Sequence, residues 1–276
     1  MAILFGIIVG LALGLTGGGG SIFAVPLLIY GLGVAPASAV AISLGAVAIT
    51  AAFGAAEGLY RGVVELRAAL IFAVAGMVAA PLGVYIGGRV SDTVVVLLFA
   101  GLMIVVAVRM GLKARRTPDE SAVVRARFAE QATADPGTVC RYSGDGRLRL
   151  NAPCSAALAA VGLVVGVLSG FFGVGGGFLI VPALILITEM GIHRAVATSL
   201  LVITLIGLSG VASAMFSGRE IDWALTALFV VGGVLGMAGG RRLARHLAGP
   251  RLQWLFAAAM LATAGFIIVE RLLFGG

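Results

Sequence analysis

Long apolar runs follow one another along the whole chain, and short polar segments separate them. Several runs reach about 20 residues, the length that a helix needs to cross the hydrocarbon core of a bilayer. Their apolar positions are continuous, whereas strands of a membrane barrel alternate apolar and polar positions. The pattern therefore predicts an all-α polytopic membrane protein with apolar segments over residues 2–15, 21–34, 37–59, 68–88, 93–112, 156–172, 178–190, 195–216, 223–240 and 252–273.

The composition agrees with this fold class. Hydrophobic residues make up 61% of the 276 positions and charged residues only 11%, too few for the surface of a soluble domain of this size. The net charge of +7 does not indicate a nucleic-acid partner, because the basic residues lie in loops beside predicted spans, as in other membrane proteins. We expect a multi-pass protein whose partner is the lipid bilayer.

Residues 11–44 and 167–200 are similar in sequence at a constant shift of 156 positions. The shift pairs Gly17 with Gly173, Pro26 with Pro182, and Ser43 with Ser199. Two homologous halves are therefore predicted, residues 1–112 and 154–276. The polar segment between them, residues 113–153, is rich in arginine, and we predict that it is a cytoplasmic linker.

Glycines interrupt each copy of the repeat between two apolar pieces. A helix over residues 2–15 or 21–34 is about 21 Å long, short of the core thickness of about 30 Å. If the two pieces cross the membrane together, each half has four crossings and the halves are parallel. If the pieces turn back, each half has three crossings and the halves are inverted. Loop charge favours the inverted arrangement, which leaves the fewest arginines outside, namely Arg89, Arg219 and Arg271.

The glycine clusters are the candidate binding site. Each ends where a new helix begins, and a helix start offers free N–H groups and a positive dipole end to an anion. Glycine also lets a ligand approach the backbone. The predicted substrate-binding residues are Gly18, Gly19, Gly20, Ser21, Gly175, Gly176, Gly177 and Phe178. The alternative is close helix packing, which is the favoured interpretation of Gly6, Gly10, Gly162 and Gly166.

Polar side chains near these clusters extend the candidate site. Ser43 and Ser199 occupy equivalent positions and could donate hydroxyls to an oxyanion, or bond back to their own helices. His193 and Arg194 lie at the start of a predicted span. A buried His193 would suit a proton-coupled step, and Arg194 could attract an anion to the mouth of the site.

Two cysteines flank the end of the polar linker. Neither Cys140 nor Cys154 has a CxxC partner or a nearby histidine, so no metal site is expected. Arginine-rich surroundings indicate the cytoplasm, and we predict free thiols there. No cofactor is predicted.

The paired segments GLTGGGGSIFAVPLL and GFFGVGGGFLIVPAL, followed by AVAISL and AVATSL, resemble the sulfite exporter TauE/SafE family. The resemblance implies a bacterial transporter, in the cell membrane, of sulfite, sulfonates or other small sulfur-containing anions. In the first copy Ala37 and Ser38 replace His193 and Arg194, which makes the two halves unequal.

We therefore predict a transporter of a small anion that works by alternating access. An anion channel and a structural membrane protein are the alternatives. An enzyme is not expected, because an intramembrane active site would need convergent histidines or carboxylates within the spans, and the chain has only two histidines. The sequence has no Walker motif, so no ATP site is expected. A homodimer is a possible assembly.

Overall fold

The structure is a computed structural model, and it describes residues 1–116, 140, 151–173, 177–188, 190, 192–218, 221–244, 258 and 260–269. The chain divides into two compact units. Residues 1–89 and 135–241 form the first, which contains α1 (Ala2–Thr16), α2 (Ser21–Pro26), the π-helical turn η1 (Leu27–Gly31), α3 (Pro36–Tyr60), α4 (Leu66–Gly87), α6 (Ala152–Phe172), α7 (Gly177–Ile187), α8 (Ile192–Phe216) and most of α9 (Trp223–Ala244). Residues 90–134 and 242–276 form the second, with α5 (Asp92–Arg116) and a short helix over Met260–Val269.

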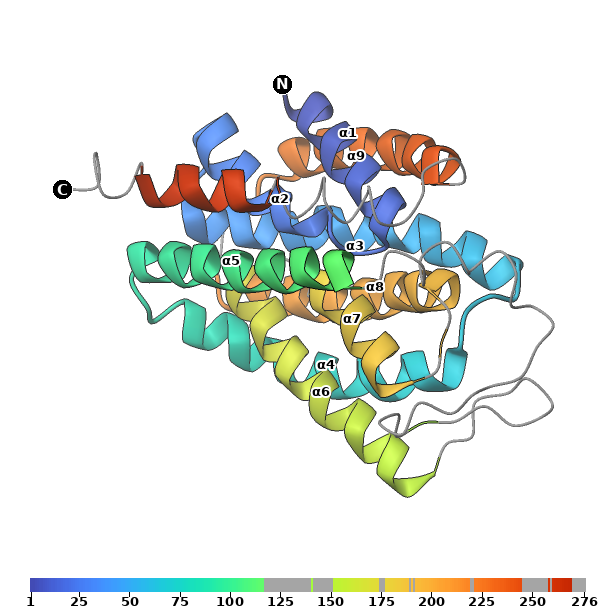
Figure 1. The fold of residues 1–276 in the computed structure, drawn as a ribbon. Coiled ribbons are helices and arrows are strands. Elements are labelled where there is room, and N and C mark those ends of the chain that lie inside the picture. Colours follow the sequence, from blue (N-terminus) through green and yellow to red (C-terminus); the bar gives the residue numbers. More distant parts are fainter. Residues whose placement is uncertain are drawn as a thin grey trace. The chain divides into compact units, whose positions relative to one another are not determined.

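The all-α fold that the apolar pattern predicts is confirmed in the described residues (Figure 1). Among the described residues, five helices are long and apolar enough to cross a membrane: Pro36–Tyr60, Leu66–Gly87, Ala152–Phe172, Arg194–Phe216 and Trp223–Leu243. The helices on either side of the first glycine cluster, Ala2–Thr16 and Ser21–Gly31, are shorter.

The first glycine cluster reverses the direction of the chain. α1 ends at Thr16 and is capped by Gly17, whose φ of 74° is left-handed, a conformation that glycine adopts without a Cβ penalty. Gly20 then lies beside Val9 and Leu13, and Gly31 lies against the ring of Phe5. The segment after the break thus runs back along α1. In the first half, the two pieces on either side of the glycine cluster therefore turn back on each other, which is one of the two local courses that the sequence leaves open.

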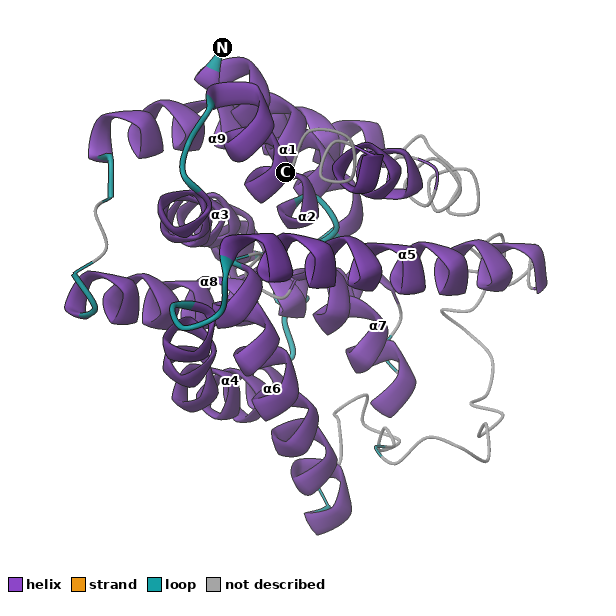
Figure 2. Cartoon of the chain, turned by 90° about the vertical axis from the view of Figure 1, so that its left-hand side faces the viewer, coloured by secondary structure: helices purple, strands orange, loops and turns teal. Residues whose placement is uncertain are grey.

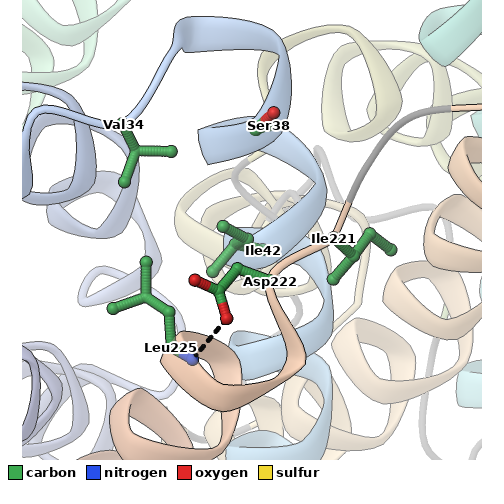
Figure 3. Close-up of a pocket in the computed structure, with 6 residues that line it drawn as sticks. All are labelled: Val34, Ser38, Ile42, Ile221, Asp222 and Leu225. Atoms are coloured by element: carbon green, nitrogen blue, oxygen red, sulfur yellow. Dashed lines mark hydrogen bonds between the residues drawn. The ribbon is translucent and has the colours of Figure 1, made fainter.

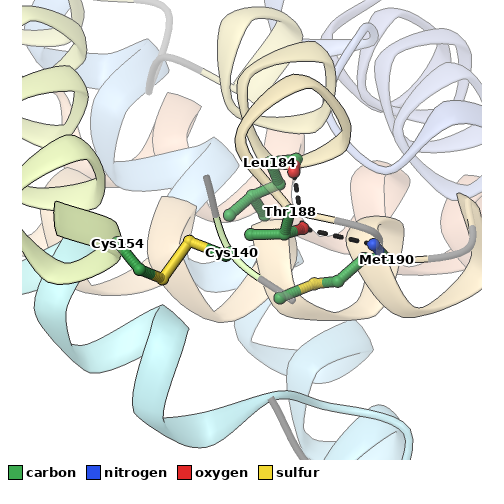
Figure 4. Close-up of a disulfide and its surroundings, with 5 residues drawn as sticks. All are labelled: Cys140, Cys154, Leu184, Thr188 and Met190. Carbon is green, nitrogen blue, oxygen red and sulfur yellow. Dashed lines mark hydrogen bonds between the residues drawn. A yellow bond between two sulfur atoms is a disulfide. The ribbon is translucent and has the colours of Figure 1, made fainter. Parts of the chain in front are cut away.

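The first two helices of the second half, α6 and α7, fold back in the same way. A disulfide lies where the end of α7 meets the beginning of α6 (Figure 4). The backbone N–H of Cys140 donates to the carbonyl of Ile187, the last residue of α7, at 3.0 Å, and its sulfur is bonded to Cys154 near the start of α6. The end of α7 therefore lies beside the beginning of α6. Our prediction of free thiols is wrong for this structure, because folding brings the two cysteine Cα atoms to 5.0 Å, a distance that a disulfide spans.

α3 and α8 are repeat equivalents and pack against each other in opposite directions. Gly45 of α3 faces Val211, whereas Gly58, thirteen residues later, faces Ala197. These two helices are the most buried of the five long ones. Because these equivalent helices run in opposite directions, the rotation that superposes one half on the other turns each helix end to end.

Glycines on α1 and α6 pack against the fourth helix of the opposite half. A Cβ on Gly10 would overlap the backbone of Gly233 in α9, and a Cβ on Gly166 would overlap that of Gly76 in α4. The pairs α1–α9 and α4–α6 lie side by side in both views (Figures 1 and 2). The packing role predicted for these glycines is confirmed, and Gly6 and Gly162 make the same kind of contact.

Candidate functional site

The two glycine breaks meet inside the first unit. A Cβ built on Gly18 would overlap the backbone of Gly177. On either side of this contact, Gly17 packs on Val196 of α8 and Gly173 packs on Val40 of α3. The two contacts are equivalent under the 156-residue shift. Each glycine break therefore packs against two parts of the other half, namely its glycine break and its third helix.

Backbone and hydroxyl groups of the first break are partly bonded to one another. Thr16 Oγ1 accepts the N–H of Gly19 at 2.9 Å. The hydroxyl of Ser21 donates to the carbonyl of Gly18 at 2.7 Å, and its N–H donates to the same oxygen at 3.3 Å. Across the described residues, the N–H groups of Gly18 and Gly20 have no acceptor, although both residues are buried. Buried donors of this kind favour a ligand that accepts hydrogen bonds.

The equivalent residues Ser43 and Ser199 differ in their hydrogen bonds. Ser199 Oγ lies 2.7 Å from the carbonyl oxygen of Gly17 and 2.8 Å from that of Val196, so its hydroxyl ties α8 to the first break. Ser43 is also completely buried, but its Oγ has no hydrogen-bond partner among the described residues. It lies three residues after Val40, on the face of α3 that meets Gly173. Ser43 thus offers an unused hydroxyl near the second break.

Arg194 pairs with a residue that the sequence analysis did not consider. Its Nη1 lies 2.7 Å from Glu65 Oε1, and the backbone N–H of Glu65 donates to Thr198 Oγ1 at 3.1 Å. Glu65 precedes α4, just as Asp222 precedes α9, and this equivalence in the repeat is the signal that could have drawn attention to it. The ion pair joins the start of α4 to the start of α8, and the side chain of Arg194 is 45% exposed.

The structure describes only part of the predicted site. Gly175 and Gly176 lie outside the described residues, as do the side chains of Phe178 and His193. Gly177 begins α7 and touches Gly18. The residues that the fold brings together are therefore Gly18 with Gly177, and Ser199 with Gly17. Binding of a substrate to them remains a prediction.

Comparison with known proteins identifies the family. The family model described as "Sulfite exporter TauE/SafE" matches residues 2–267, almost the whole chain. The chain belongs to this family. A "Probable membrane transporter protein" of Xylella fastidiosa (strain 9a5c) is 37% identical over 265 residues, which cover 95% of this chain and 91% of that protein. The "Probable membrane transporter protein YunE" of Bacillus subtilis (strain 168) is 30% identical and covers 87% of this chain and 88% of its own. No solved structure matches.

Membership in the TauE/SafE family, together with five helices of spanning length, makes this chain a multi-pass membrane transporter of the bacterial plasma membrane. The predictions of the family, the transporter class and the location are confirmed.

Proposed function

We propose that this transporter moves a small sulfur oxyanion, sulfite or an organosulfonate, and binds it where the two glycine breaks meet. Buried hydrogen-bond donors without acceptors carry the proposal: the hydroxyl of Ser43 and the N–H groups of Gly18 and Gly20. An oxyanion accepts several hydrogen bonds at once, and Gly20, the N-cap of α2, places its N–H at a helix start, which suits a negative charge. Gly19, Ser21, Gly175, Gly176, Gly177, Phe178 and Ser199 complete the proposed site.

The proposed site takes its donors mainly from the backbone. Among the described ion pairs, Arg194 bonds to Glu65, and Arg61 and Arg241 bond to Glu57. These three arginines thus pair with carboxylates at helix ends. A site lined by backbone and hydroxyl donors holds an anion without trapping it as tightly as an arginine fork would, which suits a transporter that must release its cargo.

The orientation of the halves supports alternating access. α3 and α8 run antiparallel, and each half has a glycine-tipped hairpin before them. If both helices cross the membrane, the repeats are inverted, the arrangement from which many transporters alternate between two faces. We place the linker, the end of α3 and the start of α8 on the cytoplasmic side, because Arg61, Arg67 and Arg194 gather there.

Counterflow in sealed vesicles tests the function. Purified protein is reconstituted in liposomes loaded with unlabelled sulfite, and the uptake of external ³⁵S-sulfite is followed. A carrier gives a transient overshoot of label inside, saturable in external sulfite and absent in protein-free liposomes. Taurine, sulfoacetate, sulfate and acetate in the external medium then rank the substrates by competition.

Two outcomes contradict the proposal. Uptake without overshoot that rises in proportion to concentration indicates an anion channel. If protein whose folding is verified by circular dichroism takes up no sulfur oxyanion, the proposed substrate class is rejected.

A further inference from the structure

The two halves place different residues at equivalent pairs of helix starts. A shift of 156 positions relates α3 to α8, and a shift of 157 relates α4 to α9. Ser38 is therefore the counterpart of Arg194, and Asp222 is the counterpart of Glu65. One mouth lies between the starts of α8 and α4, and the other between the starts of α3 and α9. We call them the linker-side mouth and the far mouth.

The linker-side mouth is closed in this structure. The ion pair of Arg194 with Glu65, at 2.7 Å, joins its two helix starts. Beneath the ion pair, the N–H of Glu65 donates to Thr198 Oγ1 at 3.1 Å. Thr198 and Ala68 are both completely buried. The ion pair and the backbone hydrogen bond thus hold the start of α4 against the start of α8.

The far mouth is open. A pocket of about 460 Å³ lies between the two helix starts, lined by Val34, Ser38, Ile42, Ile221, Asp222 and Leu225 (Figure 3). Asp222 caps its own helix, since its Oδ1 accepts the N–H of Leu225 at 2.9 Å. Ser38 has no charge to offer Asp222, so this pair cannot form the salt bridge that closes the other mouth.

We propose that the pocket is the access site through which the anion reaches the glycine breaks, and that the Arg194–Glu65 ion pair is the gate on the opposite face. The inference rests on the proposed transport function. In an inverted-repeat carrier, the second state exchanges the conformations of the two halves. The ion pair then breaks, the linker-side mouth opens, and the Ser38–Asp222 mouth closes.

The chemistry of the pair suits a gate. Both side chains reach solvent, with 45% of Arg194 and 20% of Glu65 exposed. An ion pair in such a position contributes little free energy, so it can break in each cycle. Because one mouth has this pair and the other lacks it, the chain without substrate favours the state that is open at the pocket.

Cysteine accessibility tests the gate without any substrate. In a background with Cys140→Ser and Cys154→Ser, one reporter is Ser38→Cys in the pocket, and the other is Ala68→Cys beneath the gate. The labelling rate with a small maleimide is measured in isolated membranes. Glu65→Gln is expected to slow labelling at position 38 and to speed labelling at position 68, each about two- to fivefold. Arg61→Gln, which removes the exposed ion pair with Glu57 on the same face, should change neither rate.

Other variants guard against a folding defect. Arg194→Gln removes the same pair from the other partner and should give the same two shifts. The charge-swapped Glu65→Arg, Arg194→Glu variant should restore the original rates. Unchanged rates in both Glu65→Gln and Arg194→Gln would overturn the gate. Shifted rates in a protein that transports no sulfur oxyanion would support the gate and reject only the proposed substrate.

Discussion

Gly18 and Gly177 touch backbone to backbone, although they belong to different halves of the chain. A Cβ on Gly177 would lie 2.8 Å from the Cα of Gly18, and a Cβ on Gly18 would overlap the carbonyl of Gly177. Neither position has room for a methyl group. The contact joins the tips of the two hairpins, so the geometry of the proposed binding site depends on it.

We expect Gly18→Ala to separate the hairpin tips and to abolish sulfite counterflow. Overpacking a tight contact costs about 1–3 kcal/mol of stability, which thermal unfolding in detergent should detect. Gly239→Ala is the matched control, since nothing lies within 4 Å of a Cβ there and alanine is the better helix former. Normal counterflow in the Gly18→Ala variant would contradict a site at the tips.

The equivalent serines should respond differently to alanine. Ser199→Ala removes the hydrogen bond to Gly17 and should lower the stability by about 0.6 kcal/mol, a typical value for a hydrogen bond between membrane helices. Ser43→Ala removes a hydroxyl that has no partner among the described residues, so its unfolding midpoint should stay unchanged. The apparent sulfite affinity in counterflow should nevertheless fall in Ser43→Ala. If stability falls and affinity is unchanged, Ser43 serves folding only.

Tyr60 and Phe216 test the inverted arrangement. They are repeat equivalents at the ends of α3 and α8, and 95% and 93% of their surfaces are exposed. In intact cells, a membrane-impermeant maleimide should label Phe216→Cys and leave Tyr60→Cys unlabelled until the membrane is opened, with Cys140 and Cys154 replaced by serine in both variants. Labelling of both positions from outside would show that the halves are parallel.

The disulfide between Cys140 and Cys154 reports which face carries the linker. If the linker is cytoplasmic, as its arginines predict, reducing conditions keep the pair as thiols in cells. Cells quenched with acid and denatured should then show two thiols that react with maleimide-polyethylene glycol. Air-oxidised purified protein should show none, and Cys140→Ser should show one. A disulfide already present in cells would place the linker outside and reverse both faces.

The apolar pattern was enough to predict the all-α membrane fold, and the 156-residue shift was enough to predict two homologous halves. Both follow from local rules, because a bilayer requires long apolar helices and a duplication preserves spacing. The packing of Gly10 and Gly166 was also predictable, since small residues on apolar helices allow backbones to approach.

Other features depend on contacts between distant segments, which local patterns do not encode. Segment length left open whether the glycine breaks turn back, and the fold decided this by placing Gly20 beside Val9. The pairing of Cys140 with Cys154 was missed for the same reason. Arg194 was singled out from the sequence, but its partner Glu65 lies 129 positions away. Only the packing of α4 on α8 brings the two charges together, and this packing also makes one mouth of the repeat pair unlike the other.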